Sequence, residues 1–357
     1  MSHQCLPQNI IGVTLITLFL VGCGAPLATP TPVPRTAIPI PATDTPTEIS
    51  PTAAVTTTSA DGIWTTRADM PTGRWELSTC VVGGKIYAIG GAGPVYQALH
   101  TLEVYDPATD SWTTRSEMPT ARQCLSTSVV NGKIYAIGGG ASPWASYTSL
   151  EVFSTVEEYD PATDTWTAKS PMPTARVCHH ASVVDGRIYV IGGSDASTPD
   201  DRSHVRAVEV YDPATDTWTR EGEMRASRAA GFSSVVDGKI YVIGGYGGPQ
   251  RVDEYDPSTD TWTTRSEMPS ARRSLSTSAV DGKIYAFGGY VPDVAGHAGV
   301  ATVEVYDPAT DTWTTAPDMP AGRFGLRTSV VGGKIYVIGG MDKWVGSAYR
   351  TVLEYDP

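Results

Sequence analysis

The sequence predicts an all-β protein built from six copies of one four-stranded unit, preceded by an N-terminal region of different character. Three observations support this prediction. The 357 residues include 36 Gly and 27 Pro, with many segments rich in Val, Ile, Tyr and Thr, which is typical of short strands joined by tight turns. A set of short motifs returns six times along the chain. Asn-Gly or Asp-Gly pairs separate strand-like runs, which is a strong hairpin signal.

The repeated motifs keep strict spacings. In each unit a Met follows a Trp by six residues, an Arg follows the Met by four, and the second Gly of a Gly-Gly pair follows the Arg by seventeen. The Trp residues are Trp64, Trp112, Trp166, Trp218, Trp262 and Trp313. All variation in length falls between the second Gly and a repeated Tyr, an interval of 14, 20, 18, 10, 17 and 15 residues. Periods of about 50 residues indicate blades or solenoid units.

Each unit reads as an antiparallel meander of four strands. In the second unit the strand-like runs are 126–130, 133–137, 150–159 and 165–168, and the Asn131-Gly132 pair separates the first two. The sequence Asp-Pro-Ala-Thr-Asp at 160–164 supplies the turn between the third and fourth, because Pro presets φ and Asp bonds its own backbone. The meander places the repeated Arg and the variable interval on one face and the Asp-Pro turns on the other.

Gly-Gly, then Tyr, then Trp, in six copies over residues 61–357, resembles the kelch repeat. The resemblance implies an all-β, six-bladed β-propeller of kelch type. The last Tyr, Tyr355, has no Trp after it, and the first Trp, Trp64, has no Tyr before it. We therefore expect residues 61–67 to form the outermost strand of the sixth blade, whose inner three strands come from residues 324–356. Such a closure removes open sheet edges.

The N-terminal region predicts export and anchoring. The apolar run at residues 10–21 is too short to span a bilayer and is typical of a signal peptide, although residues 1–9 carry no Lys or Arg. Leu20-Val21-Gly22-Cys23 resembles the lipobox of bacterial lipoproteins, which implies a signal peptide over residues 1–22 and lipidation of Cys23. Residues 24–60 hold 8 Pro and 10 Thr, so residues 23–60 are expected to form an extended tether. The expected location is extracytoplasmic, lipid-anchored to the bacterial cell membrane or secreted.

The negative net charge excludes nucleic acid as a partner. The formal net charge is −12, so the chain lacks the basic footprint of a nucleic-acid-binding protein. The sequence contains none of the common catalytic or metal-binding motifs and predicts no cofactor and no metal. Removal of the signal peptide and lipidation of Cys23 leave three cysteine thiols, Cys80, Cys124 and Cys178. A disulfide between Cys124 and Cys178 is conceivable at equivalent positions of neighbouring strands, but buried free thiols are the expectation.

The candidate ligand-binding residues lie at the expected channel mouth and in the variable loops. One Arg per blade forms a candidate cationic ring, suited to a carboxylate-bearing ligand. Alternatively, each of these arginines holds its own blade together, which their regular repetition favours. Trp144 and Trp344 are rings of the variable loops that stack on a sugar, anchor a protein or fill gaps between blades. The six repeated arginines are Arg74, Arg122, Arg176, Arg228, Arg272 and Arg323.

The residues just after each Arg break the symmetry of the repeat. Glu76 is the weak catalytic candidate, as an acid or base. Cys178, His179 and His180 are compatible with metal binding, but His179 points away from the other two on a strand, and a buried structural role is the stronger interpretation.

Two functions from different classes follow. The favoured one is a surface-anchored binding module that presents its variable loops to a protein or glycan partner. The alternative is an envelope sugar mutarotase or epimerase, because six-bladed kelch proteins include sialic-acid mutarotases. Copper radical oxidases also have kelch repeats, but they need seven blades and a copper ligand set that this chain lacks. The near-identity of the repeats favours the binding module, and an enzymatic activity is the less favoured interpretation.

Overall fold

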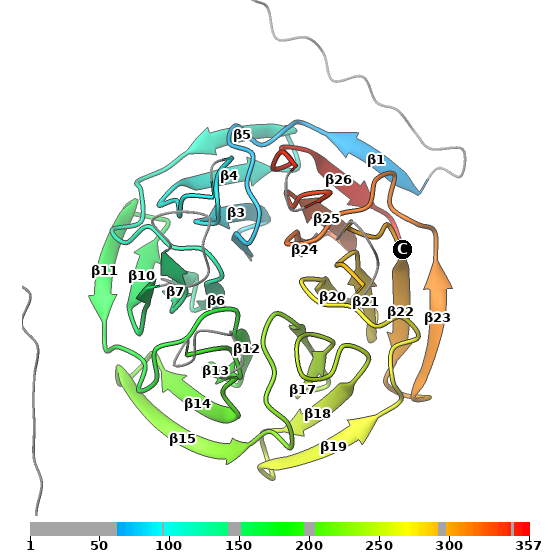
Figure 1. Cartoon of the computed structure of the whole chain (residues 1–357). Helices are drawn as coiled ribbons and strands as arrows, with labels where there is room; N and C mark the ends of the chain where they lie inside the picture. Colours follow the sequence, from blue (N-terminus) through cyan, green and yellow to red (C-terminus); the bar gives the residue numbers. More distant parts are fainter. Residues whose placement is uncertain (1–62, 95, 142–150, 196–203, 292–297, 344–345) are drawn as a thin grey trace, which may run out of the picture. The chain divides into compact units, whose positions relative to one another are not determined.

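The computed structural model describes residues 63–94, 96–141, 151–195, 204–291, 298–343 and 346–357. It confirms the predicted all-β class and the six-bladed propeller: six four-stranded antiparallel sheets surround a central channel (Figure 1). The innermost strands of neighbouring sheets contact one another in cyclic order, from the first blade to the sixth and back to the first. Within the described ranges, no helix is long and apolar enough to cross a membrane.

The strands of each blade are given from the channel outward. They are β2 (Ser78–Val82), β3 (Lys85–Ile89), β4 (Leu102–Asp106) and β5 (Ser111–Thr114) in blade 1; β6 (Ser126–Val130), β7 (Lys133–Ile137), β10 (Val156–Asp160) and β11 (Thr165–Lys169) in blade 2; β12 (His180–Val184), β13 (Arg187–Ile191), β14 (Ala207–Asp212) and β15 (Thr217–Glu223) in blade 3; β16 (Phe232–Val236), β17 (Lys239–Ile243), β18 (Val252–Asp256) and β19 (Thr261–Arg265) in blade 4; β20 (Ser276–Val280), β21 (Lys283–Phe287), β22 (Val303–Asp307) and β23 (Thr312–Ala316) in blade 5; and β24 (Arg327–Val331), β25 (Lys334–Ile338), β26 (Val352–Tyr355) and β1 (Trp64–Arg67) in blade 6.

The predicted hairpins form as the turn residues require. Asn131 and Gly132 both adopt left-handed φ angles, 52° and 75°, and join β6 to β7 with Val130 opposite Lys133. The first two strands of this blade have the predicted bounds. The third is shorter than the predicted run 150–159, because Glu151–Val152 forms the separate β9, which pairs with β8 (Gly140–Ala141). The β10 ladder with β7 begins at Val156, opposite Ile137.

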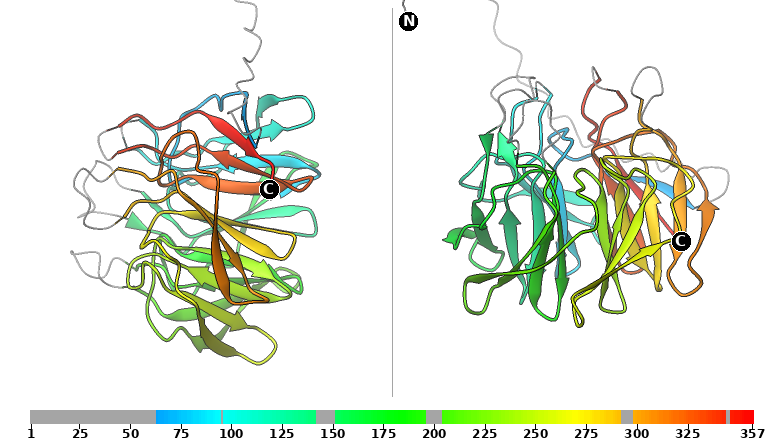
Figure 2. Two further views of the ribbon diagram at one scale, coloured as in Figure 1. Left: turned by 90° about the vertical axis from the view of Figure 1, so that its right-hand side faces the viewer. Right: turned by 60° about the horizontal axis from the view of Figure 1, so that its bottom comes forward.

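The strands run between two faces of the ring (Figure 2). We call the face with the variable intervals the loop face. The opposite face, with the hairpin turns and the Asp-Pro turns, is the turn face. On the turn face the repeated Tyr and Asp join neighbouring blades. The Tyr105 hydroxyl donates to Asp110 Oδ1 at 2.6 Å, and this oxygen also accepts from the backbone N of Ala68, which follows the outer strand of blade 6. The Trp112 indole donates to the Ala68 carbonyl at 2.9 Å.

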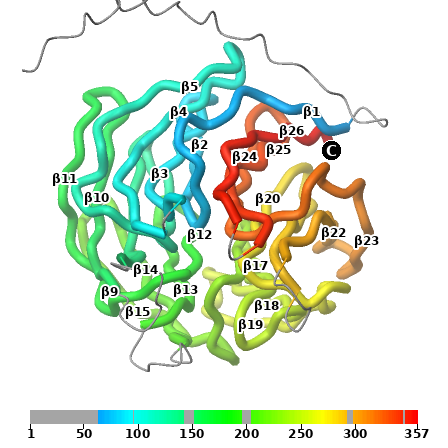
Figure 3. Tube along the Cα trace, turned by 45° about the horizontal axis from the view of Figure 1, so that its top comes forward, coloured from blue at the N-terminus to red at the C-terminus, as the bar shows by residue number. Residues whose placement is uncertain are grey.

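The predicted closure of the ring is confirmed. β1 lies along β26, as the blue and red tubes of Figure 3 show, with Trp64 opposite Tyr355 and Arg67 opposite Val352. Trp64 is 3% exposed, its ring centroid lies 4.7 Å from that of Tyr355, and its indole N–H donates to the Pro317 carbonyl of blade 5 at 3.3 Å. The N-terminal strand therefore completes the sixth sheet and also contacts the fifth.

Removing this strand tests its contribution to stability. Deletion of residues 61–68 removes a buried Trp and the whole β1 ladder, and loss of a buried large side chain alone costs about 3–5 kcal/mol. We expect the calorimetric unfolding midpoint to fall by roughly 10 °C or more. Deletion of residues 53–60, an equal length of the predicted tether, is the matched control and is expected to leave the midpoint unchanged. Equal midpoints for the two deletions would contradict the closure.

Candidate functional site

A closed circle of backbone hydrogen bonds surrounds the channel on the loop face. The residue two positions after each repeated Arg donates its N–H to the carbonyl of the equivalent residue of the preceding blade. Cys124 donates to Glu76 at 3.0 Å and Cys178 to Cys124 at 2.9 Å, and Glu76 closes the circle by donating to Gly325 at 2.8 Å. We call these six residues the mouth ring. Its members are Glu76, Cys124, Cys178, Ala230, Ser274 and Gly325.

Every member of the mouth ring has a left-handed backbone. The φ angles lie between 48° at Glu76 and 63° at Gly325, and Gly325 alone is a glycine. A left-handed backbone costs about 1–2 kcal/mol of conformational energy at each non-glycine residue, so five members of the ring are strained. The ring hydrogen bonds and the packing of the blades hold them there. Nothing in the sequence marks this feature, because five of the six positions lack the glycine that is usual in this conformation.

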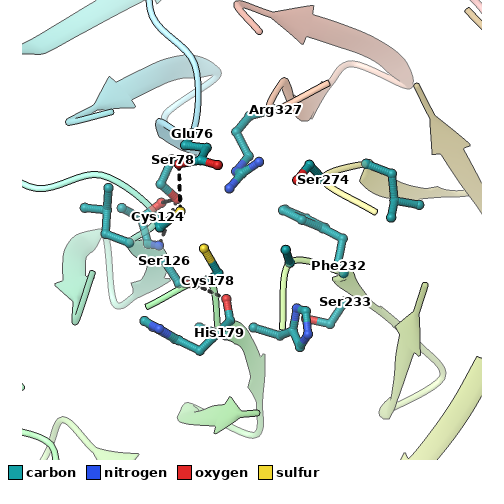
Figure 4. Close-up of a pocket in the computed structure, with 18 of the residues that line it drawn as sticks. Glu76, Ser78, Cys124, Ser126, Cys178, His179, Phe232, Ser233, Ser274 and Arg327 are labelled. Carbon is teal, nitrogen blue, oxygen red and sulfur yellow. Dashed lines mark hydrogen bonds between the residues drawn. The ribbon is translucent and has the colours of Figure 1, made fainter. Parts of the chain in front are cut away.

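The mouth ring opens on a cavity of about 200 Å³ on the channel axis. The first strands of five blades contribute to its lining, and blade 5 contributes Ser274 and Leu275, which precede its first strand. Figure 4 shows the side chains that meet there, among them a carboxylate, a guanidinium, two thiols and a phenyl ring. These come, respectively, from Glu76, Arg327, Cys124, Cys178 and Phe232. The arrangement is chemically asymmetric although the scaffold is nearly six-fold.

Arg327 and Glu76 bring opposite charges to this cavity from neighbouring blades. Arg327 occupies the repeat position at which three other blades have Ser78, Ser126 and Ser276. Its guanidinium carbon lies 5.3 Å from the Phe232 ring centroid, and its Nη1 donates to the Leu326 carbonyl at 2.7 Å. Burial lowers the pKa of Arg327, and the nearby Cys124, Glu76 and Cys178 oppose this shift. Arg327 was not among the predicted site residues, since it lies outside the motif that repeats.

The described cysteines are free thiols, as expected; Cys80 and Cys124 are buried, but Cys178 is partly exposed, contrary to the expectation of buried thiols. Burial raises the pKa of Cys80 to about 12. The Cys124 Sγ donates a hydrogen bond to Glu76 Oε2 at 2.9 Å, across the boundary between blades 2 and 1. The Cys178 side chain, burial and the Glu76 carboxylate together hold the Cys124 pKa well above its ordinary value.

The two histidines of β12 and its approach are buried and neutral. Burial, with the nearby Arg176 and His180, lowers the His179 pKa well below 6.5, and burial lowers that of His180 to about 3. The His179 ring packs against Gly138 of blade 2. Across the described part of the chain, no three His, Cys, Asp or Glu side chains are arranged to hold a metal ion. The burial of both rings agrees with the structural interpretation of these histidines.

The six repeated arginines do not line the cavity. All are buried within the blades, at 0–2% exposure, so a ligand on the channel axis does not reach them. Arg74 shows the pattern: its Nη2 pairs with Glu103 Oε2 at 2.7 Å and its Nη1 donates to the Gly90 carbonyl at 2.9 Å. This geometry favours the architectural alternative over the cationic ring. The other ion pairs of this kind are Arg122–Glu157, Arg176–Glu209, Arg228–Asp253 and Arg272–Glu304.

Blade 6 departs from this pattern. Leu353 stands where the other blades have the acidic partner, so Arg323 has no equivalent carboxylate. Arg323 instead donates to the Gly339 carbonyl at 3.2 Å and to the Thr351 hydroxyl at 3.0 Å, and lies 4.5 Å from the Tyr349 ring centroid. Burial lowers its pKa to about 10.

Aromatic side chains of blades 1, 4, 5 and 6 pack together beside the mouth ring. The Arg273 guanidinium lies 4.0 Å from the Tyr246 ring centroid and 4.4 Å from that of Tyr290. Phe324 packs between Tyr290 and Trp75, at centroid distances of 5.6 and 6.2 Å. Tyr290, Phe324 and Trp75 are at most 2% exposed, so these rings fill gaps between blades. Trp144 and Trp344, the predicted ligand-binding rings, lie outside the described residues, as does the predicted lipidation site Cys23.

Comparison with known proteins identifies the family. A family model described as the Attractin/LZTR1 beta-propeller matches residues 59–253, which is more than half of the chain. A second, described as the KLHDC2/KLHL20/DRC7 Kelch-repeats domain, matches residues 198–357. The chain belongs to the kelch-repeat β-propeller family.

Individual kelch proteins match over part of their length. Kelch-like protein terF of Aspergillus terreus is 30% identical over 203 residues, 56% of this chain and 35% of terF. The human Kelch repeat and BTB domain-containing protein 12 is 29% identical over 217 residues, 57% of this chain and 28% of the human protein. The matched region thus spans about a third of these relatives. A solved structure described as "Structure of YjhT" shares the fold, with a TM-score of 0.68 and 19% identity over 80% of this chain and 96% of that one.

The difference between Arg272 and Arg323 gives a testable prediction for the kelch scaffold. Arg272→Met leaves Glu304 buried without its partner, which costs about 3–5 kcal/mol of unfolding free energy. Arg323→Met removes a buried cation that has no acidic partner, so we expect a cost of about 2 kcal/mol or less. Urea unfolding at pH 7 measures both. Equal costs would show that the acidic partner is not what makes these arginines important.

The buried histidine predicts a pH dependence. The folded-state pKa of His179 is depressed, so below pH 6.5 the unfolded chain binds a proton that the folded chain does not. The free energy of unfolding therefore decreases as the pH is lowered. His179→Leu introduces the residue that blades 1, 2, 5 and 6 have at this position. As the pH is lowered from 6 to 5, we expect the free energy of unfolding of this variant, relative to that of the natural chain, to increase by about 1.4 kcal/mol per pH unit. Urea unfolding across this range checks it, and a difference that does not change with pH would contradict it.

Proposed function

We propose that this kelch propeller is a binding module that holds a protein partner on its loop face. The observation that carries the proposal is the contrast between the two faces. The turn face repeats the same Tyr–Asp contact in five of the six blades. On the loop face the intervals vary from 10 to 20 residues. Variable loops on a rigid scaffold are the usual arrangement of a binding surface.

The comparisons support a protein partner in general terms. Kelch propellers are typical protein-binding modules, and the matched relatives carry kelch names. Because the match covers about a third of those relatives, their partners are not transferred to this chain. The partner proposed here is one recognised by this chain's own loops.

We propose further that the module works outside the cytoplasm on a membrane anchor. Gly22-Cys23 supplies the residue for lipidation, and the Pro/Thr-rich residues 24–60 supply an extended spacer. Lipid chains on Cys23 give stable membrane attachment when more than one is present. The spacer then places the propeller at a distance from the membrane, where a large partner has room to bind.

One observation favours a second candidate, catalysis on a small acidic sugar as in a mutarotase. Glu76 and Arg327 break the symmetry of the repeat and face the same cavity of about 200 Å³. A guanidinium binds a carboxylate, and a carboxylate beside it moves a proton. In this candidate Arg327 holds the acid group and Glu76 acts as the acid or base.

Site-specific photo-crosslinking in the producing cells tests the first candidate. A benzophenone amino acid is placed at Gln97 or Ser347, which are exposed on the loop face, and as a matched control at the exposed Ala108 or Ala309 of the turn face. We expect at least one loop-face position to yield a discrete crosslinked protein and both turn-face positions to yield none. Crosslinks from the turn face alone, or from neither face, would contradict a loop-face protein partner.

Thermal shift with acidic monosaccharides distinguishes the second candidate. If sialic acid or a uronic acid raises the unfolding midpoint, and Arg327→Gln abolishes this rise while Ser276→Ala, at the equivalent position of blade 5, does not, the channel binds acidic sugars. Loss of sugar interconversion in Glu76→Gln then assigns catalysis. The binding-module proposal expects no shift with any of these sugars.

A further inference from the structure

Two thiols stand next to each other in the mouth ring. The Cys178 N–H donates to the Cys124 carbonyl at 2.9 Å, and both residues have left-handed φ angles, 51° and 52°. A direct backbone hydrogen bond keeps the two Cα atoms within about 7 Å, and disulfides need about 4.4–6.8 Å. Both side chains line the cavity (Figure 4), and the Cys178 side chain contributes to the raised pKa of Cys124. The scaffold therefore positions this pair for a bond between blades 2 and 3.

The surroundings supply what thiol chemistry needs. Glu76 Oε2 accepts the Cys124 S–H proton in a hydrogen bond of 2.9 Å, so a base is in place for this thiol. The guanidinium of Arg327 interacts electrostatically with both sulfurs, and a nearby cation stabilises a thiolate. Cys178 is partly exposed, whereas Cys124 is only 7% exposed. Cys178 is thus the sulfur that a reagent in the channel meets first.

We propose that Cys124 and Cys178 are a redox-active pair that small disulfide compounds convert reversibly into a disulfide linking blades 2 and 3. Cys178 loses its proton and attacks one sulfur of the compound, whose S–S bond breaks and whose other half leaves as a thiol with that proton. Cys124 then gives its proton to Glu76 and attacks the Cys178 sulfur. The second half of the compound leaves as a thiol, with the proton from Glu76. Two protein thiols are oxidised and one disulfide is reduced to two thiols.

The disulfide would stabilise the folded chain, which a modification of one surface thiol would not do. It closes a loop that runs from residue 124 to residue 178 and contains all of blade 2. Crosslinks that close long loops stabilise proteins by restricting the unfolded chain. Cys80 is the internal control, because it is buried in the packing between blades and does not line the cavity.

Peptide mapping of the full chain tests the pair directly. The chain is treated with hydroxyethyl disulfide, remaining thiols are alkylated, and the protein is cut after Lys and Arg. Cys80, Cys124 and Cys178 then fall in separate peptides, 75–85, 123–133 and 177–187. We expect peptides 123–133 and 177–187 to be joined and peptide 75–85 to be alkylated. We also expect the unfolding midpoint to rise by about 5 °C and to return on reduction with dithiothreitol.

Two variants test the roles in the pair. In Cys124→Ser the mixed disulfide is expected to persist on residue 178, because no second thiol resolves it. In Glu76→Gln the same resolution is expected to slow by about tenfold or more, whereas Ser274→Ala, also in the mouth ring, leaves it unchanged. Stable mixed disulfides on both cysteines of the natural chain, or alkylation of both after oxidation, would overturn the pair. Resolution at the natural rate in Glu76→Gln would overturn the role of Glu76.

Discussion

Closure of the ring depends on the backbone of the repeated arginine. The Arg122 carbonyl accepts a hydrogen bond of 2.8 Å from the N–H of Gly91 in the preceding blade, and the same contact recurs around the ring to Arg74 and Gly340. A Cβ at Gly90 would lie 2.5 Å from that carbonyl oxygen, so the first glycine of each pair is needed for the approach. The guanidinium of each arginine, buried in its own blade, holds this backbone in position. One residue per blade therefore serves both the blade and its neighbour.

The mouth ring follows from the same constraint. Two residues beyond each arginine, the chains of all six blades meet in one circle of hydrogen bonds with left-handed backbones. The hydrogen bonds of the circle use backbone atoms only, so they form with different side chains, at the cost of strain wherever the residue is not glycine. Glu76, the thiol pair and Ser274 therefore occupy equivalent positions without disturbing the scaffold. The asymmetry of the cavity is thus compatible with the regularity of the fold.

Sequence alone predicted the scaffold well, because its signals are local and repeated. The spacing of Trp64 and Tyr355 predicted the closing strand, and Asn131-Gly132 predicted a hairpin. The candidate functional site was harder to predict from the sequence. The partner of Arg74 is Glu103, 29 residues away, and nothing local marks the pair as buried. Arg327 and Phe232 break a pattern of hydroxyl side chains, so they carry no repeat signal, and their meeting in the channel depends on the closed ring.

Native-state hydrogen exchange measures the central claim, that the mouth ring and the arginine contacts form one closed circuit. The backbone N–H groups of Cys124, Cys178 and Ser274 should exchange only by global unfolding, with the same opening free energy as the amides of β7. The same protection is expected for Gly91, which bonds to the Arg122 carbonyl. Exchange of the mouth-ring amides by local opening, well below the free energy of global unfolding, would contradict a ring that is closed at its mouth.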